Sequence, residues 1–131
     1  MSLGSERLLP YQYVVLRCVP RVDREEFLNV GVALYCQAAD YLDALAHVDR
    51  ARVEAFAGGV DLDRLESSLA AVRAVCRGDH AAGAAGRADR GARFGFVKAP
   101  RSTILQPGPV HGGLTTDPAR QLEHLLDRLV R

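Results

Sequence analysis

Cysteine and lysine are scarce in this sequence, and each shortage argues against particular classes of protein. Its three cysteines, Cys18, Cys36 and Cys76, are widely spaced and include no C-x-x-C pair. An odd count with this spacing argues against a disulfide framework and against a zinc site. Lys98 is the only lysine, and the formal net charge is +1, so no overall field attracts nucleic acid or an anionic membrane. We expect three reduced cysteines that pack as small apolar side chains in a reducing cytoplasm.

Targeting and membrane-spanning segments are missing as well. Residues 1–10 contain no apolar stretch of signal-peptide length, and no window of the sequence approaches a membrane span. The 131 residues are 48% apolar and 25% charged, which is ordinary for a globular domain with its own core. The sequence therefore predicts one cytoplasmic domain over residues 1–131, without a membrane partner.

Recognisable catalytic motifs are absent too. There is no G-x-S-x-G, and the histidines show neither H-x-x-x-H nor H-E-x-x-H spacing; they are His47, His80, His111 and His124. The run His111-Gly112-Gly113 resembles an oxyanion-hole loop, but it stands alone. These absences argue against a metalloenzyme and against a serine hydrolase, and nothing in the sequence indicates a cofactor.

The sequence does contain a tyrosine-rich first third. All four tyrosines lie within the first 41 residues, at Tyr11, Tyr13, Tyr35 and Tyr41. Three β-forming runs cover this region, at 11–19, 29–36 and 41–48, and in each the even-numbered residues form an apolar face. The predicted sheet then has one aliphatic face and one face that carries Tyr13, Arg17, Asn29, Tyr35 and His47. Such a face either binds a partner or is covered by a helix, and the sequence leaves both alternatives open.

Helix signals follow the strands. Asp49 is placed to cap a short helix over 50–57, and evenly spaced apolar residues predict a longer helix over 61–77 that ends at Gly78. Asp117 as N-cap and Pro118 begin a final helix with a stripe of leucines. Together these elements predict an α+β fold, a single-domain sandwich in which a small, mostly antiparallel sheet packs against two or three helices.

The region between the helices is less regular. Residues 78–92 hold four glycines and no large apolar side chain, which predicts a mobile surface loop. Arg93–Lys98 alternates weakly and predicts an edge strand, and Ser102–Gln106 predicts another. The F-G-F-V order within the first of these resembles the centre of an RNA-recognition motif. Because Ala99 stands where that motif needs an aromatic residue, nucleic acid is not the expected partner.

A group of basic residues offers one candidate for ligand chemistry. Arginine forks suit phosphate or carboxylate, so an anion pocket would form if both halves of the chain supplied residues to it, namely Arg17, Arg21, Arg24, Arg101 and His111. The alternative is a solvated rim of arginines, with Arg17 stacked on Tyr13 or Tyr35.

Several segments together carry a family resemblance. The segments Tyr13–Pro20 and Glu25–Leu34, then Arg101–Gln106, His111–Leu114 and the helix that begins at Asp117-Pro118, resemble a bacterial family known as domain of unknown function 3037. The resemblance spans nearly the whole chain and implies no activity. Members of that family are often encoded beside a HipA-like protein kinase, which implies such a kinase as a partner.

Two functional hypotheses follow. The first is a non-catalytic accessory or interaction domain that engages a protein partner, with a HipA-like kinase as the candidate, through Tyr13, Arg17, Asn29 and Tyr35 or through its C-terminal loop. The second is a small enzyme, or a nucleotide- or RNA-binding protein. It would hold a phosphate-containing ligand in an anion pocket made by Arg17, Asn29, Arg101 and His111.

Overall fold

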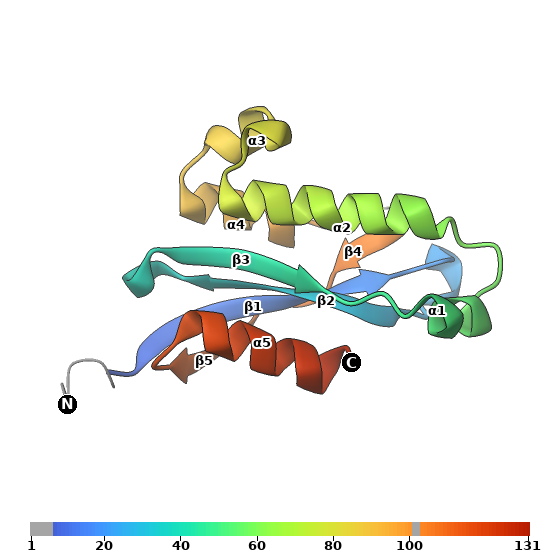
Figure 1. The fold of residues 1–131 in the computed structure, drawn as a ribbon, viewed down its shortest axis with the longest axis horizontal. Helices are drawn as coiled ribbons and strands as arrows, with labels where there is room; N and C mark the ends of the chain where they lie inside the picture. The colour runs from blue at the N-terminus through green and yellow to red at the C-terminus, as the bar shows by residue number, and fades with distance from the viewer. Residues whose placement is uncertain (1–6, 101–102) are drawn as a thin grey trace.

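The computed structural model describes residues 7–100 and 103–131 and confirms the α+β class, with one antiparallel sheet between helices (Figure 1). The strands are β1 (Leu9–Cys18), β2 (Leu28–Cys36), β3 (Tyr41–Ala46), β4 (Leu105–Pro107) and β5 (His111–Thr115). The helices are α1 (Arg50–Phe56), α2 (Leu62–Arg77), α3 (Ala84–Arg87), α4 (Arg90–Lys98) and α5 (Pro118–Leu129). Three 3-10 turns, η2 (Val22–Arg24), η3 (Gln37–Ala39) and η4 (His80–Ala82), complete the described elements.

Aspartate begins four of the helices. In each case its carboxylate accepts a hydrogen bond from the backbone N–H three residues on, at Asp49, Asp61, Asp89 and Asp117. Gly78 ends α2 with a φ of 69°, and Pro118 opens α5. The three predicted helices and the first three predicted strands are therefore confirmed, with ends shifted by up to two residues.

The sheet has the order β3-β2-β1, and both β4 and β5 pair with the far edge of β1. β4 lies beside the C-terminal half of β1, from Leu16 to Cys18, and β5 lies beside its N-terminal half, from Leu9 to Tyr13. The register in which β4 pairs with β1 differs by one residue from the register in which β5 pairs with β1. Residues 108–110 therefore form a bulge between β4 and β5, which follow each other along the same edge of β1. A second irregularity lies on the other side of β1, where Val30 is the extra residue of β2.

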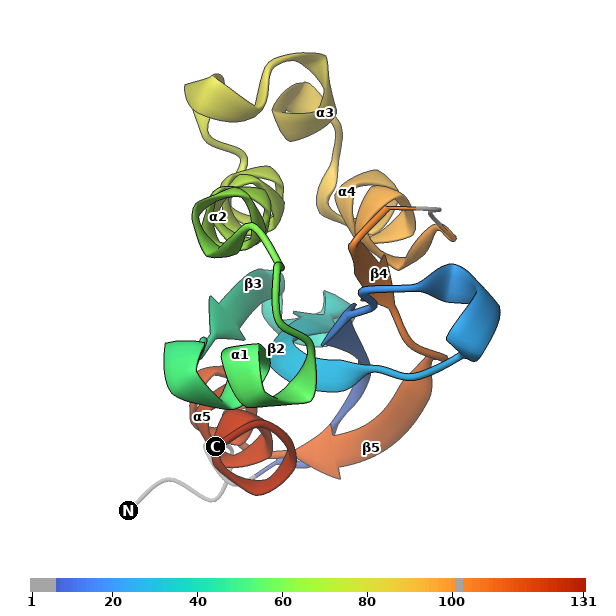
Figure 2. The ribbon, with the colours of Figure 1, turned by 90° about the vertical axis from the view of Figure 1, so that its right-hand side faces the viewer.

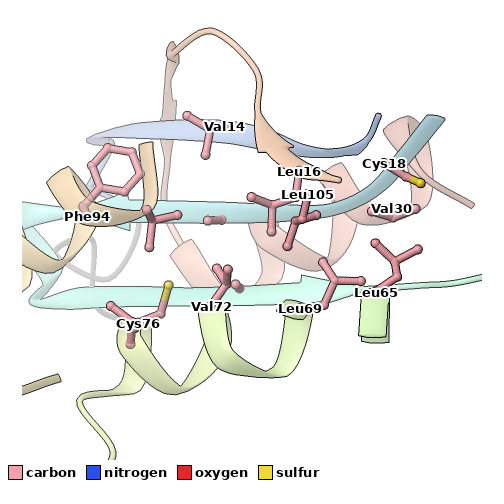
Figure 3. Close-up of a cluster of buried hydrophobic side chains, with 14 of the residues drawn as sticks. Val14, Leu16, Cys18, Val30, Leu65, Leu69, Val72, Cys76, Phe94 and Leu105 are labelled. Carbon is pink, nitrogen blue, oxygen red and sulfur yellow. The ribbon is translucent and has the colours of Figure 1, made fainter. Parts of the chain in front are cut away.

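Hydrophobic cores lie on both faces of the sheet. On one face α2 and α4 cover the strands, and Figure 3 shows Leu65, Leu69 and Val72 of α2 directed at the sheet with Phe94 of α4 beside them. On the other face α5 packs its leucines against the sheet, and the buried residues there are Tyr11, Val32, Leu34, Cys36, Leu122, Leu125, Leu126 and Val130. The strands are thus buried on both sides, because each face has its own helical cover.

Two sequence predictions are wrong in the region after α2. Arg93–Lys98 is part of helix α4 and not an edge strand, because Asp89 caps it and Phe94 and Val97 point together into the core. Residues 78–92, predicted as a loop, contain η4, α3 and the start of α4. The predicted strand 102–106 corresponds to β4, which begins at Leu105; residues 101 and 102 lie outside the described part.

Candidate functional site

The tyrosines do not share one face of the sheet. β1 and β2 pair with Gln12 opposite Tyr35, so the even residues of β1 share a face with the odd residues of β2. Tyr35 therefore lies on the α4 side, where its ring centroid is 5.3 Å from that of Phe94. Tyr13 lies on the other side and packs against the α5 cluster. The prediction of a single tyrosine face is wrong at β2. Alternation shows which residues of one strand share a face, but the pairing between two strands decides which residues of the second strand lie on that same face.

Arg17 and Asn29 are the predicted site residues that the fold brings together. They lie directly opposite each other on β1 and β2. The guanidinium carbon of Arg17 sits 3.9 Å from the centre of the Phe27 ring, so the stacking partner is neither Tyr13 nor Tyr35. Asn29 donates a 3.0 Å hydrogen bond from its side-chain amide to the carbonyl of Leu129 and so holds the end of α5 to the sheet.

His111 lies in a different place. It is opposite Tyr13 on β5, and the two rings stack with centroids 5.2 Å apart. Because Arg17 is four residues farther along β1, its Cα lies about 13 Å along the strand from Tyr13. Arg101 falls outside the described residues. The described part of the chain therefore does not bring His111 to Arg17 and Asn29.

The chemistry of the buried thiols also argues against a nucleophilic centre. Burial raises the pKa of Cys76 to about 12 and raises the pKa of Cys18, so both remain thiols near neutral pH. All three cysteines are unpaired and buried, as the sequence predicts.

The described residues contain no cluster of three or more metal-ligating side chains. Within the same ranges, no helix is both long and apolar enough to cross a membrane.

A large hollow lies on a surface for which the sequence predicted no site. α2 and α4 run side by side above the sheet, and α3 lies across them (Figure 2). The α2–α4 groove between these helices has a volume of about 1010 Å³, and its lining includes Ser67, Ala71 and Ala74 of α2, Ala85 of α3, Phe96 of α4 and Ile104. Its size is at the upper end of the range of ligand-binding pockets.

Small side chains shape the wall that α2 contributes to this groove. Ser67, Ala71 and Ala74 recur at four- and three-residue steps, on a face of α2 next to its leucine stripe. Because these side chains are short, another backbone can approach α2 closely. On the opposite wall the side chain of Phe96 remains 49% exposed. The stripe is visible in the sequence, but only the placement of α4 as a helix makes it one wall of a groove.

The charged residues that line the groove are Asp61 and Arg64, at the N-terminal end of α2. α3 and α4 expose Arg87, Arg90 and Lys98, and Asp89 is occupied as an N-cap. Arg90 lies 3.8 Å from the carboxylate of Asp40, a contact exposed to solvent. The lining of the groove is therefore mostly apolar, and these exposed basic residues of α3 and α4 lie outside it.

Comparison with known proteins gives a single positive finding. A family model described as protein of unknown function (DUF3037) matches residues 13–130. No curated protein and no solved structure matches the chain.

Proposed function

Because the chain belongs to the DUF3037 family, whose description names no activity, we propose a function from geometry: it is a non-catalytic protein-binding module. The α2–α4 groove is the observation that carries this proposal. Its occupant is an amphipathic helix of a partner protein, which lays its apolar face along the small residues of α2 and against Phe96. The sheet faces are less suitable for this role, since α2 and α4 cover one and α5 covers the other.

The charged residues of the lining, Asp61 and Arg64, lie together at the N-terminal end of α2. A partner helix that places an acidic residue near Arg64 would be electrostatically complementary there, which favours encounter and orientation more than raw affinity. The family resemblance implies a HipA-like kinase as the protein that supplies this helix.

The alternative function, an anion pocket built from Arg17, Asn29, Arg101 and His111, has weaker support. A pocket needs its donors to converge on one ligand, and the register sets His111 beside Tyr13 and away from Arg17. Arg17 is instead stacked on Phe27. We therefore place the binding function in the groove.

The groove proposal is tested with one pair of arginine variants. Ala71→Arg introduces a long charged side chain into the groove, and Ala55→Arg makes the same change on an exposed position of α1 that lines no described pocket. Binding of a purified HipA-like kinase from the same organism is measured by titration calorimetry. We expect Ala71→Arg to weaken binding at least about tenfold and Ala55→Arg to leave it unchanged. Equal affinities of Ala71→Arg and the unaltered protein would rule out the groove as the contact surface.

A further inference from the structure

The two outer edges of the sheet differ in how they are protected. In the described part of the chain, β3 pairs with β2 alone and β5 pairs with β1 alone, so each leaves one row of backbone groups without a strand partner. Such an edge is a template for pairing with another chain unless the protein blocks it. The two edges can therefore be compared for their ability to accept a further strand.

The β3 edge is blocked by charge. The N–H of Ala44 donates to the side-chain carboxylate of its neighbour Asp43, 2.8 Å away. Two arginines of α2 hold this carboxylate in turn, with Arg73 at 3.3 Å and Arg77 at 3.5 Å. The N–H of His47 points inward and donates to the carbonyl of Val30 on β2. Because backbone groups alternate in direction along a strand, the N–H of Ala44, three residues earlier, points outward to the open edge. An incoming strand would have to displace a carboxylate that two guanidinium groups stabilise.

The β5 edge has no such protection. Its residues, His-Gly-Gly-Leu-Thr, include no carboxylate, arginine, lysine or proline. Leu114 is 60% exposed, and Val110 and Leu8 beside the strand are 42% and 59% exposed. Leu114 lies opposite Pro10, on the sheet face where Pro10, Gln12 and Tyr35 line a hollow of about 580 Å³. An open edge thus adjoins an exposed, uncharged strip of sheet.

We propose that two copies of this chain associate through β5, paired antiparallel across a twofold axis at Gly113. In this register Leu114 of one copy lies opposite Gly112 of the other, and His111 lies opposite Thr115. Gly112 leaves room for the leucine, because a Cβ placed there would meet only the carbonyl oxygen of Tyr11, at 3.5 Å. Position 113 requires glycine for a separate reason, since a Cβ there would lie 2.6 Å from the hydroxyl of Tyr11 in the same copy.

Charge favours a second copy as the occupant of this edge. In this twofold pairing, a residue next to the axis lies diagonally across from its own copy, so a charged residue there would lie near a like charge. β5 carries no such charged residue. The β3 edge does, because Asp43, Arg73 and Arg77 lie there. The net charge of +1 adds little long-range repulsion between copies.

The size of the interface determines how strong this association is. One five-residue strand and three exposed apolar side chains cover less than the roughly 800 Å² per partner that a stable complex buries. The dimer is therefore weak and depends on concentration. The surface is separate from the α2–α4 groove, so this proposal does not rest on the proposed kinase interaction.

Sedimentation velocity over about a hundredfold range of protein concentration tests the dimer, because mass action sets its population. We expect the average mass of the unaltered protein to rise towards that of a dimer. Leu114→Lys places like charges at the paired strands and should remain monomeric. Phe56→Lys replaces an exposed aromatic residue of α1, far from β5 in the sequence, and should associate like the unaltered protein.

A second variant keeps the test decisive if Leu114→Lys does not fold, which circular dichroism would show. Gly112→Val places its Cβ in ordinary contact with the carbonyl oxygen of Tyr11 and fills the space that Leu114 of the second copy needs, so it should also weaken association. An unaltered protein that stays monomeric at every concentration would overturn the proposal. Association that neither variant weakens would overturn it as well, and so would pairing of β5 with an unrelated extended peptide in preference to a second copy.

Discussion

Gly78 and Gly95 show how differently two glycines act in neighbouring helices. Gly78 adopts a φ of 69° at the end of α2, and a Cβ there would lie 2.3 Å from a terminal guanidinium nitrogen of Arg93. Arg93 has little room to move, since it is only 9% exposed and lies against the C-terminal end of α2, where the helix dipole favours a cation. Gly95 lies within α4, and a Cβ there would meet nothing within 4 Å.

Alanine substitutions at these two positions should change stability in opposite directions. Gly78→Ala is expected to lower the free energy of unfolding by about 1–3 kcal/mol, because alanine is strained at positive φ and forces the buried guanidinium to shift. Gly95→Ala should raise it by about 0.5–1 kcal/mol, since alanine favours the helix and fills open space. Urea unfolding of both variants measures the two effects. A loss of stability in Gly95→Ala would show that the space beside it is not open.

Among the single elements, strand β3 depends on the side chain of Asp43, which lies at its own open edge. Asp43 is only 15% exposed, accepts a hydrogen bond from the N–H of Ala44 and faces two arginines. The same carboxylate therefore closes the edge strand and attaches it to α2. Removing it leaves an unpaired N–H and two guanidinium groups without their partner.

Two substitutions separate the hydrogen bond from the charge. Asp43→Ala should cost about 1–3 kcal/mol, since it removes both. Asp43→Asn keeps an oxygen that can accept from the N–H of Ala44, so its cost should be smaller, and the difference reports the charge contribution of the arginines. Thermal unfolding at low and at high salt compares the two, and salt should reduce that difference. Identical melting temperatures for both variants would mean that the charge contributes nothing.

For the molecule as a whole, acidic groups whose pKa burial raises link stability to alkaline pH, and the largest of these shifts are those of Cys76 and of the half-buried Tyr41. Burial raises the pKa of Cys76 from 9.0 to about 12, and burial with help from the Asp43 carboxylate raises the pKa of Tyr41 from 10.0 to about 12. In each case the unfolded chain loses its proton at a lower pH than the folded chain. The stabilisation is therefore complete below about pH 9 and is lost as pH rises towards about 12.

This linkage predicts a falling free energy of unfolding between about pH 9 and 10, with a slope of up to about 1.4 kcal/mol per pH unit from Cys76. Cys76→Ala should be less stable at neutral pH because it leaves a small cavity. Its stability should nevertheless fall less steeply over the same pH interval, because the contribution of Tyr41 is common to both proteins and that of Cys76 is lost. Urea titrations of both proteins at a series of pH values give the two slopes. Parallel slopes would mean that Cys76 does not ionise on unfolding in this range.

Local signals in the sequence predict most of the helices and strands correctly. Asp61 and Gly78 bound α2, Asp117 and Pro118 begin α5, and alternation marks the first three strands, because caps and periodicity depend only on near neighbours. Helix α4 was missed although Asp89 signals its start, since its two internal glycines and alternating phenylalanines favoured a strand.

Which surfaces are covered and which are open depends on how the helices and strands pack together. The pairing of Gln12 with Tyr35 places Tyr13 and Tyr35 on opposite faces, and the docking of α5 buries the face that the sequence left open. The α2–α4 groove exists because α4 is a helix that packs beside α2. These features depend on register and packing between segments far apart in the chain, and a local pattern carries no information about either.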